Sequence, residues 1–205
     1  MSIGPDIKEV YEEVGITFTL IRESGDVSGE YLHFHLNRQV TKPFIREFFL
    51  ESFFAYDTDV QAGEVVKFDT TEDAYLVMNK TPQLFENEII QYHGVLYKCN
   101  VSGELQRPSG EDEWDSNYRK QTTFEVIKSN CYALQTEALY GHDIDTDEEL
   151  GMIGVENHEL YLPASVGVQQ LDRYVPVSGE DYRVDTIKKR RYNAIDVVEL
   201  SKETR

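Results

Sequence analysis

Alternation of side-chain character near the C-terminus constrains the fold of this chain more than any other feature of the sequence. In residues 182–187 successive side chains fall on opposite faces of an extended segment. A run rich in β-branched residues, 194–200, follows the basic turn 188–193, and Ser178-Gly179 supplies a chain reversal before both. Residues 168–205 are therefore predicted to form a short β-meander.

An earlier stretch, residues 60–78, repeats part of this pattern. The offset between the two stretches is 108 residues at Glu64 and 107 residues at Tyr75. The similarity leaves an internal repeat open, and the simpler interpretation is that strands followed by acidic turns resemble one another without being repeats. The corresponding positions are Val60-Gln61 with Val168-Gln169, Glu64 with Asp172, and residues 72–77 with residues 180–184.

Composition limits both the size of the core and the choice of partner. The chain has 205 residues, of which 40% are hydrophobic, and this suffices for one substantial core or two small ones. Acidic residues outnumber basic ones by 38 to 20, and the formal charge of −18 argues against duplex binding through a basic face. Such a surface also suits a protein that must not bind passing nucleic acid.

Signals for targeting and for disulfide formation are absent from the sequence. No run approaches the roughly 18 apolar residues of a membrane span, and residues 1–10 lack the charged and apolar regions of a signal peptide. We therefore expect neither membrane insertion nor export by such a peptide. Cys99 and Cys131 form no CxxC pair, which predicts two reduced thiols rather than a disulfide or a zinc site.

The remaining pattern predicts a mainly β fold of β-barrel or sandwich-like modules with two or three short helices. Helices are expected at residues 5–14, within the Phe-rich segment 43–56, and from Asp147, where Thr146 and Glu149 make a capping box. The hydrophilic stretch 103–118 is expected to be a long loop. Strands are expected at 16–21, 31–36, 64–68, 74–79, 95–101, 121–128 and 159–162.

Two domain arrangements fit this order of elements. Residues 1–140 would form a larger β-rich module with an N-terminal helix, and residues 158–205 would form the C-terminal β-meander, with a break around 140–158. The meander is either a module of its own or is folded onto the first module as a single unit.

No motif in the sequence supplies a complete reaction centre or metal site. His33 and His35 share one face of a predicted strand but have no third ligand nearby, so an exposed pair is favoured over a metal site. Asp143, Asp145 and Asp147 imitate the start of a calcium loop without its later glycine and glutamate, which leaves only a looser cation site open. Signatures of nucleophilic catalysis and phosphate binding are absent, so we expect no enzyme, no cofactor and no metal.

One cationic turn stands out in this acidic chain. It consists of Lys188, Lys189, Arg190 and Arg191. Such a turn can present positive charge to DNA phosphates or to the acidic surface of a neighbouring copy, and a solvated turn is the simpler alternative. An acidic protein with one basic patch is suited to head-to-tail self-assembly.

A family resemblance is carried by Asp172, by residues 179–184 (Gly-Glu-Asp-Tyr-Arg-Val) and by residues 198–205 (Val-Glu-Leu-Ser-Lys-Glu-Thr-Arg). This pattern resembles the C-terminal hairpins of the small β-rich neck proteins of tailed bacteriophages, the head-closure or head-tail connector proteins. Residues 75–78 and 96–100 are similar in character. The N-terminal region, including residues 43–56, has no counterpart in that family.

The resemblance implies a structural virion protein that forms a ring at the head-tail junction and continues the DNA channel, without catalysis. Its partners would be further copies of itself, portal or adaptor proteins and tail proteins, with DNA passing through unbound and no membrane involved. It would be assembled in the host cytoplasm and would reside in the virion.

On this interpretation two groups of residues become candidates for contacts. The inter-subunit or DNA-facing contact would be Lys188, Lys189, Arg190 and Arg191. The channel or interface loop would contain Arg107, Glu111, Asp112, Glu113, Trp114 and Asp115.

Two other functions stay open at this point. A tail or baseplate component of the same virion would use similar β modules. A carbohydrate- or receptor-binding β-domain would use Trp114 and Tyr118 as a stacking platform, although Trp114 lies among acidic residues.

Overall fold

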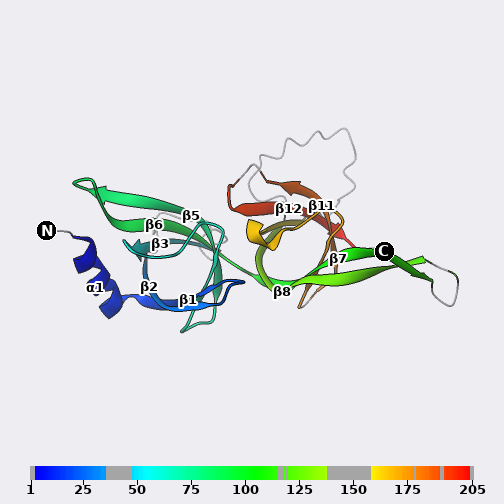
Figure 1. Ribbon diagram of the computed structural model, residues 1–205, viewed down its shortest axis with the longest axis horizontal. Coiled ribbons are helices and arrows are strands. Elements are labelled where there is room, and N and C mark those ends of the chain that lie inside the picture. Colours follow the sequence, from blue (N-terminus) through cyan, green and yellow to red (C-terminus); the bar gives the residue numbers. More distant parts are fainter. Residues whose placement is uncertain are drawn as a thin grey trace. The chain divides into compact units, whose positions relative to one another are not determined.

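The computed structural model describes residues 3–35, 48–114, 118, 120–137, 158–177, 179–189 and 192–203. Antiparallel strands dominate these residues and form two closed six-stranded barrels (Figure 1). The predicted mainly β fold with barrel modules is therefore confirmed. Within the described ranges there is one α-helix and one 3₁₀ turn, where two or three short helices were expected.

The first barrel follows the helix α1 (Gly4–Val14). Its strands are β1 (Ile16–Ile21), β2 (Val27–His35), β3 (Phe49–Ala55), β4 (Val65–Phe68), β5 (Ala74–Phe85) and β6 (Glu88–Lys98). Around the barrel they follow the order β1-β2-β3-β6-β5-β4, and pairing of β4 with β1 closes the cylinder. Closure leaves no open sheet edge around the barrel wall and directs alternate side chains into the interior.

The second barrel begins after Cys99 and Asn100. Its strands are β7 (Val101–Trp114), β8 (Lys120–Glu137), β9 (His158–Pro163), β10 (Arg173–Pro176), β11 (Tyr182–Lys188) and β12 (Ile195–Lys202). A 3₁₀ turn, η1 (Ala164–Val166), follows β9. The order around the barrel is β10-β11-β12-β9-β8-β7, and β10 closes it by pairing with β7.

The boundary between the two compact units differs from the expected one. One unit contains Met1–Cys99 with Tyr192–Ile195, and the other contains Asn100–Arg191 with Asp196–Arg205. The expected break around 140–158 therefore falls inside the second unit. The physical reason is closure, because β11 and β12 cannot form a barrel without β7 and β8, which precede residue 140.

The two barrels have the same strand order. When β7 to β12 are matched with β1 to β6 in chain order, each neighbouring pair in the first barrel has its counterpart in the second. Local irregularities correspond as well: register shifts in β1 and β5, at Phe18/Thr19 and Val77/Asn79, recur in β7 and β11, at Gly103/Leu105 and Val184/Thr186. The internal repeat indicated by residues 60–78 is thus present in the fold, and it extends over both whole barrels.

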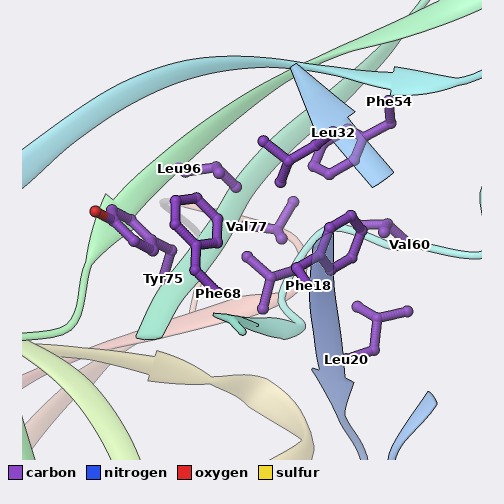
Figure 2. Packing of buried hydrophobic residues seen from close by; sticks show 10 residues of the cluster. Phe18, Leu20, Leu32, Phe54, Val60, Phe68, Tyr75, Val77 and Leu96 are labelled. Carbon is purple, nitrogen blue, oxygen red and sulfur yellow. The ribbon is translucent and has the colours of Figure 1, made fainter. Parts of the chain in front are cut away.

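Each barrel encloses its own hydrophobic core. In the first, the rings of Phe18 and Phe54 meet edge to face at 5.9 Å, and Figure 2 shows the neighbouring side chains converging on the same interior. In the second, Tyr174 is fully buried and donates its hydroxyl hydrogen to the Cys131 carbonyl at 3.1 Å. Corresponding buried positions are Leu20 and Leu105, Val60 and Val168, Val66 and Tyr174, Val77 and Val184, and Leu96 and Leu200.

Of the expected helices, one is present and a second is replaced by a strand. The N-terminal helix is confirmed as α1, which ends where the Gly15 amide donates to the Tyr11 carbonyl. The segment 43–56 was expected to be helical, but its described part is strand β3, with Ser52 and Phe54 inward and Phe53 between them less buried. Pairing with both β2 and β6 decides this ambiguous apolar run in favour of a strand. The helix expected from Asp147 lies outside the described residues.

Candidate functional site

The stretch expected to be a long loop, residues 103–118, is largely a strand. β7 runs as far as Trp114, which pairs with Lys120 of β8, so the two strands form a hairpin arm that continues beyond the barrel (Figure 1). A two-stranded arm exposes both faces and needs no apolar alternation, which explains why its polar sequence predicted a loop. The strand includes Glu111, Asp112, Glu113 and Trp114, and Asp115 lies outside the described residues.

Arg107, the first of the candidate channel residues, has an internal partner. Its Nε and Nη2 atoms each donate to a carboxylate oxygen of Asp172 at 2.9 Å, and Nη2 also donates to the Gly167 carbonyl at 3.0 Å. Asp172 accepts a further hydrogen bond from the Gln169 amide at 2.8 Å. The hydrogen bonds to Asp172 raise the pKa of the Arg107 guanidinium, so this charge is paired within the barrel. Its place at a channel or interface stays a prediction.

The first barrel contains the same arrangement. Arg22 donates from Nε and Nη2 to the two Glu64 carboxylate oxygens at 2.6 and 3.0 Å, and from Nη2 to the Asp59 carbonyl at 2.9 Å. Glu64 also accepts from the Gln61 amide at 2.7 Å. We call these two constellations, Arg22 with Glu64 and Arg107 with Asp172, the arginine locks. Each one ties the segment before β4 or β10 to the strand that opens its barrel.

The cationic turn is only partly available for an external contact. Lys188, the last residue of β11, forms ion pairs with Glu159 at 2.8 Å and Glu199 at 2.6 Å, and its pKa is raised by these bonds. Lys189 is exposed. Burial of Asp196 raises the pKa of its carboxyl group, and the positive charge of Lys189 partly offsets this rise. Arg190 and Arg191 lie outside the described residues. Among the described members of the turn, Lys189 is therefore the one that faces solvent.

The described residues contain no cluster suited to catalysis by a metal. No three His, Cys, Asp or Glu side chains in that part of the chain lie close enough together to hold an ion. His33 stacks on Tyr11 with a centroid distance of 6.2 Å. Asp143, Asp145 and Asp147 fall outside the described ranges, so the looser cation site stays a prediction. No helix in the described part of the chain is long and apolar enough to cross a membrane.

A shallow depression lies beside α1 on the first barrel. It has a volume of about 110 Å³, and Lys8 and Asp57 form an ion pair of 2.6 Å in its wall. Glu12 and Glu30 also line it, and Glu30 accepts a hydrogen bond from the Thr58 hydroxyl. Two of the four charged groups on its wall thus bind each other.

Two features were missed by reasoning from the sequence. The first is the lock on Arg22, whose only signal was the repeated Val-Gln-x-x-acid pattern at residues 60–64 and 168–172. The second is the β5–β6 hairpin, which continues past the barrel as an arm, whereas the expected strands covered only 74–79 and 95–101 (Figure 1). Its tip exposes Leu84, Phe85 and Ile89. A reversal at Glu86-Asn87 between two apolar pairs was the available signal.

Comparisons with known proteins give little. No family model matches the sequence, and no curated protein matches it. Two solved structures of K. pneumonia MrkH are distant matches: a complex with c-di-GMP is 5% identical, with coverage of 98% of this chain and 85% of that one at a TM-score of 0.16. A P2(1) crystal of MrkH is 7% identical, with coverage of 99% and 84% at a TM-score of 0.15. TM-scores this low carry no argument about fold or ligand.

Proposed function

We propose that this protein is a structural subunit of the head-tail junction of a tailed bacteriophage, where copies form a ring around the path of the DNA. One observation carries the proposal: the segment that resembles the connector proteins, from Asp172 onward, supplies strands β10, β11 and β12 of a closed barrel. The resemblance implies a β-barrel body with long loops toward the DNA channel. Both barrels here extend a hairpin arm, which would take the place of such a loop (Figure 1).

The charge of the chain supports a role beside moving DNA. A formal charge of −18 places like charge opposite the phosphate backbone, so DNA can pass a ring of such subunits without adhering to it. The β7–β8 arm carries Glu111, Asp112 and Glu113 next to Trp114, and Asp115 follows it in sequence. We assign this arm to the channel or to an interface, as an extended hairpin rather than a loop.

The subunit contact is assigned to the turn between β11 and β12. Lys189 is the exposed cation of this turn, and Arg190 and Arg191 follow it in sequence. Lys188 is excluded from the contact because Glu159 and Glu199 already pair with it. A turn with this charge suits the acidic surface of a neighbouring subunit.

The test is the mass of the assembled protein. Native mass spectrometry of the purified chain, alone and mixed with the portal-adaptor complex of its parent virion, should give a closed ring or a ring formed on that complex. Binding to tail proteins alone would instead assign the subunit to the tail or baseplate. Indifference to every neck and tail component would refute the proposal.

A separate titration addresses the carbohydrate-binding alternative. Trp114 is the single tryptophan of the chain, so its fluorescence reports on this arm without interference. A saturable change on addition of glycans would favour a binding domain over a structural subunit. We expect no saturable change.

A further inference from the structure

The tip of the β5–β6 arm, residues 84–89, is an apolar surface in a strongly polar protein. Leu84 is 64% exposed, Phe85 48% and Ile89 37%. Leu84 lies opposite Ile89 across the hairpin, so their side chains share one face. Phe85 lies opposite Glu88 and therefore points to the other face, so the tip exposes apolar side chains on both faces of the hairpin. Three large apolar side chains at one projecting tip mark an interaction site more clearly than single exposed residues do.

The tip is also held in one shape. Glu86 and Asn87 have φ angles of 49° and 66°, the left-handed pair that a tight two-residue hairpin turn requires. Phe85 pairs with Glu88 directly beside the turn. A rigid tip loses little conformational entropy on binding, which favours a protein contact of defined geometry.

Strand addition on the β5 edge of the arm is disfavoured. Pro82 lies in the arm part of β5 and has no N–H to donate to an added strand. This favours a contact through the side chains of the tip. Its exposed apolar residues would then be the anchors of the contact.

The charge of the tip selects its partner. The charged residues at the tip are Glu86 and Glu88, and both are exposed, so an anionic membrane or a nucleic acid would be repelled. A protein surface with exposed cations is the complement. The longest run of consecutive cations in this chain is residues 188–191.

The internal repeat places Lys189, the exposed described residue of this run, at the counterpart of the acidic tip. β5 and β6 correspond to β11 and β12, so the turn after Phe85 and the turn after Lys188 are the same turn in the two barrels. One copy of the repeat thus carries Glu86 and Glu88 where the other carries exposed Lys189. Opposite charges at equivalent turns suit a contact between different barrels of two chains.

We propose that the β5–β6 arm tip of one molecule docks on the β11–β12 turn of a second copy of the same chain. Glu86 and Glu88 face Lys189 across the contact, and Leu84, Phe85 and Ile89 are buried in it. A contact between unlike surfaces is head-to-tail, so repetition closes a ring or extends a filament. The inference rests on the proposed ring only for this closure, and the contact itself can be tested without it.

The first experiment measures self-association by sedimentation velocity over a wide concentration range. Replacing Leu84→Ser and Phe85→Ser together should weaken self-association by at least about tenfold, the effect expected for loss of a central apolar anchor. The matched control is Val10→Ser with Val14→Ser, since these residues are exposed on α1 of the same barrel. The control should associate like the wild type, and an unchanged circular dichroism spectrum shows that both variants fold.

The second experiment exchanges the charges. Glu86→Lys with Glu88→Lys should weaken association, and so should Lys189→Glu alone. All three changes in one chain should restore association, because the opposite charges face each other again. Added salt should weaken wild-type association, as screening of such charges requires.

The outcomes separate this contact from the proposed function. Wild-type protein that stays monomeric at millimolar concentration, or a wild-type assembly that the arm variants leave intact, overturns the contact. The ring at the head-tail junction is judged independently, by binding to the portal-adaptor complex. If the arm substitutions abolish self-association but the wild-type assembly does not bind the portal-adaptor complex, the contact is supported and the proposed function is refuted.

Discussion

Glu64 and Asp172 occupy the same position in the two barrels, and each accepts two hydrogen bonds from the arginine of its lock. The agreement extends to the backbone around them. The carbonyl of each carboxylate residue accepts the amide of an equivalent core valine, Val77 at 2.9 Å and Val184 at 2.8 Å. Side chain, loop and strand therefore correspond group by group, which makes the two barrels copies of one design rather than two barrels of equal strand number.

The two locks differ in burial. The side chain of Asp172 is 1% exposed, whereas that of Glu64 is 21% exposed. The shorter aspartate draws the carboxylate into the barrel and removes it from water. Loss of its arginine would leave a buried charge with fewer partners, while Glu64 would recover hydration.

Arg107→Ala is therefore expected to lower the free energy of unfolding by about 3 kcal/mol, and Arg22→Ala by roughly 1 kcal/mol. Chemical denaturation followed by circular dichroism measures both. Arg183→Ala is the control, since the pair of Arg183 with Asp185 lies near the surface and should contribute less than about 1 kcal/mol. Equal losses for the two lock arginines would contradict the role given to burial.

The two cysteines should differ in reactivity. Cys131 is 3% exposed, and burial raises its pKa to about 11, so little thiolate is present at pH 8. Cys99 is only half-buried, and neither thiol is in a disulfide. A thiol reagent at pH 8 should modify one cysteine of the native protein quickly and the second only after unfolding. In Cys99→Ser the fast reaction should vanish, and a fast reaction that persists would place Cys131 nearer to solvent.

Gly94 should not tolerate a side chain. It lies in β6 beneath Phe54, and a Cβ atom there would come within 2.4 Å of the Phe54 ring and 3.0 Å of the Ser52 hydroxyl. Phe54 is fully buried and cannot move aside, so Gly94→Ala is expected to cost about 1–3 kcal/mol of stability.

A double variant tests this explanation of Gly94. Phe54→Leu makes room for the new methyl group, so Gly94→Ala with Phe54→Leu should lose less stability than the sum of the two single losses. Urea denaturation of all three variants gives the comparison. Additive losses would show that the clash with Phe54 is not the cause.

Much of the fold could be predicted from the sequence because it depends on local patterns of residues. The helix α1 follows from Pro5 near its start and Gly15 past its end, and β1 follows from alternation. The repeat could be recognised because a buried valine and an acid recur at the same spacing in both copies, at Val60 with Glu64 and at Val168 with Asp172.

The rest depends on partners distant in sequence. β3 is a strand because β2 and β6 flank it, and the domain boundary lies at Cys99 because β7 closes the second barrel. The arginine of each lock is equally remote from its carboxylate, 42 residues for Arg22 and 65 for Arg107. No local window holds both members of such a pair, so the pairing of Arg107 with Asp172 could not be predicted from the sequence. The pairing of Lys188 with Glu159 and Glu199 was not predicted either.

The buried carboxyl group of Asp196 should cost the folded protein stability at neutral pH. It is 3% exposed, and burial raises its pKa above the ordinary value of 3.8. The folded protein then binds this proton more tightly than the unfolded chain does. Ionisation therefore costs stability as pH rises from 3.8 through the folded-state pKa, and the cost is complete above it.

Asp196→Asn removes the charge at similar size, so it should raise the free energy of unfolding at pH 7. The gain should shrink as pH falls through the folded-state pKa toward 3.8, because the wild-type group is then protonated as well. Urea denaturation at pH 7 and near pH 4 measures the difference. A variant that is less stable than wild type by the same amount at both pH values would show that Asp196 stabilises the barrel through a hydrogen bond that asparagine cannot make, rather than costing stability through its charge.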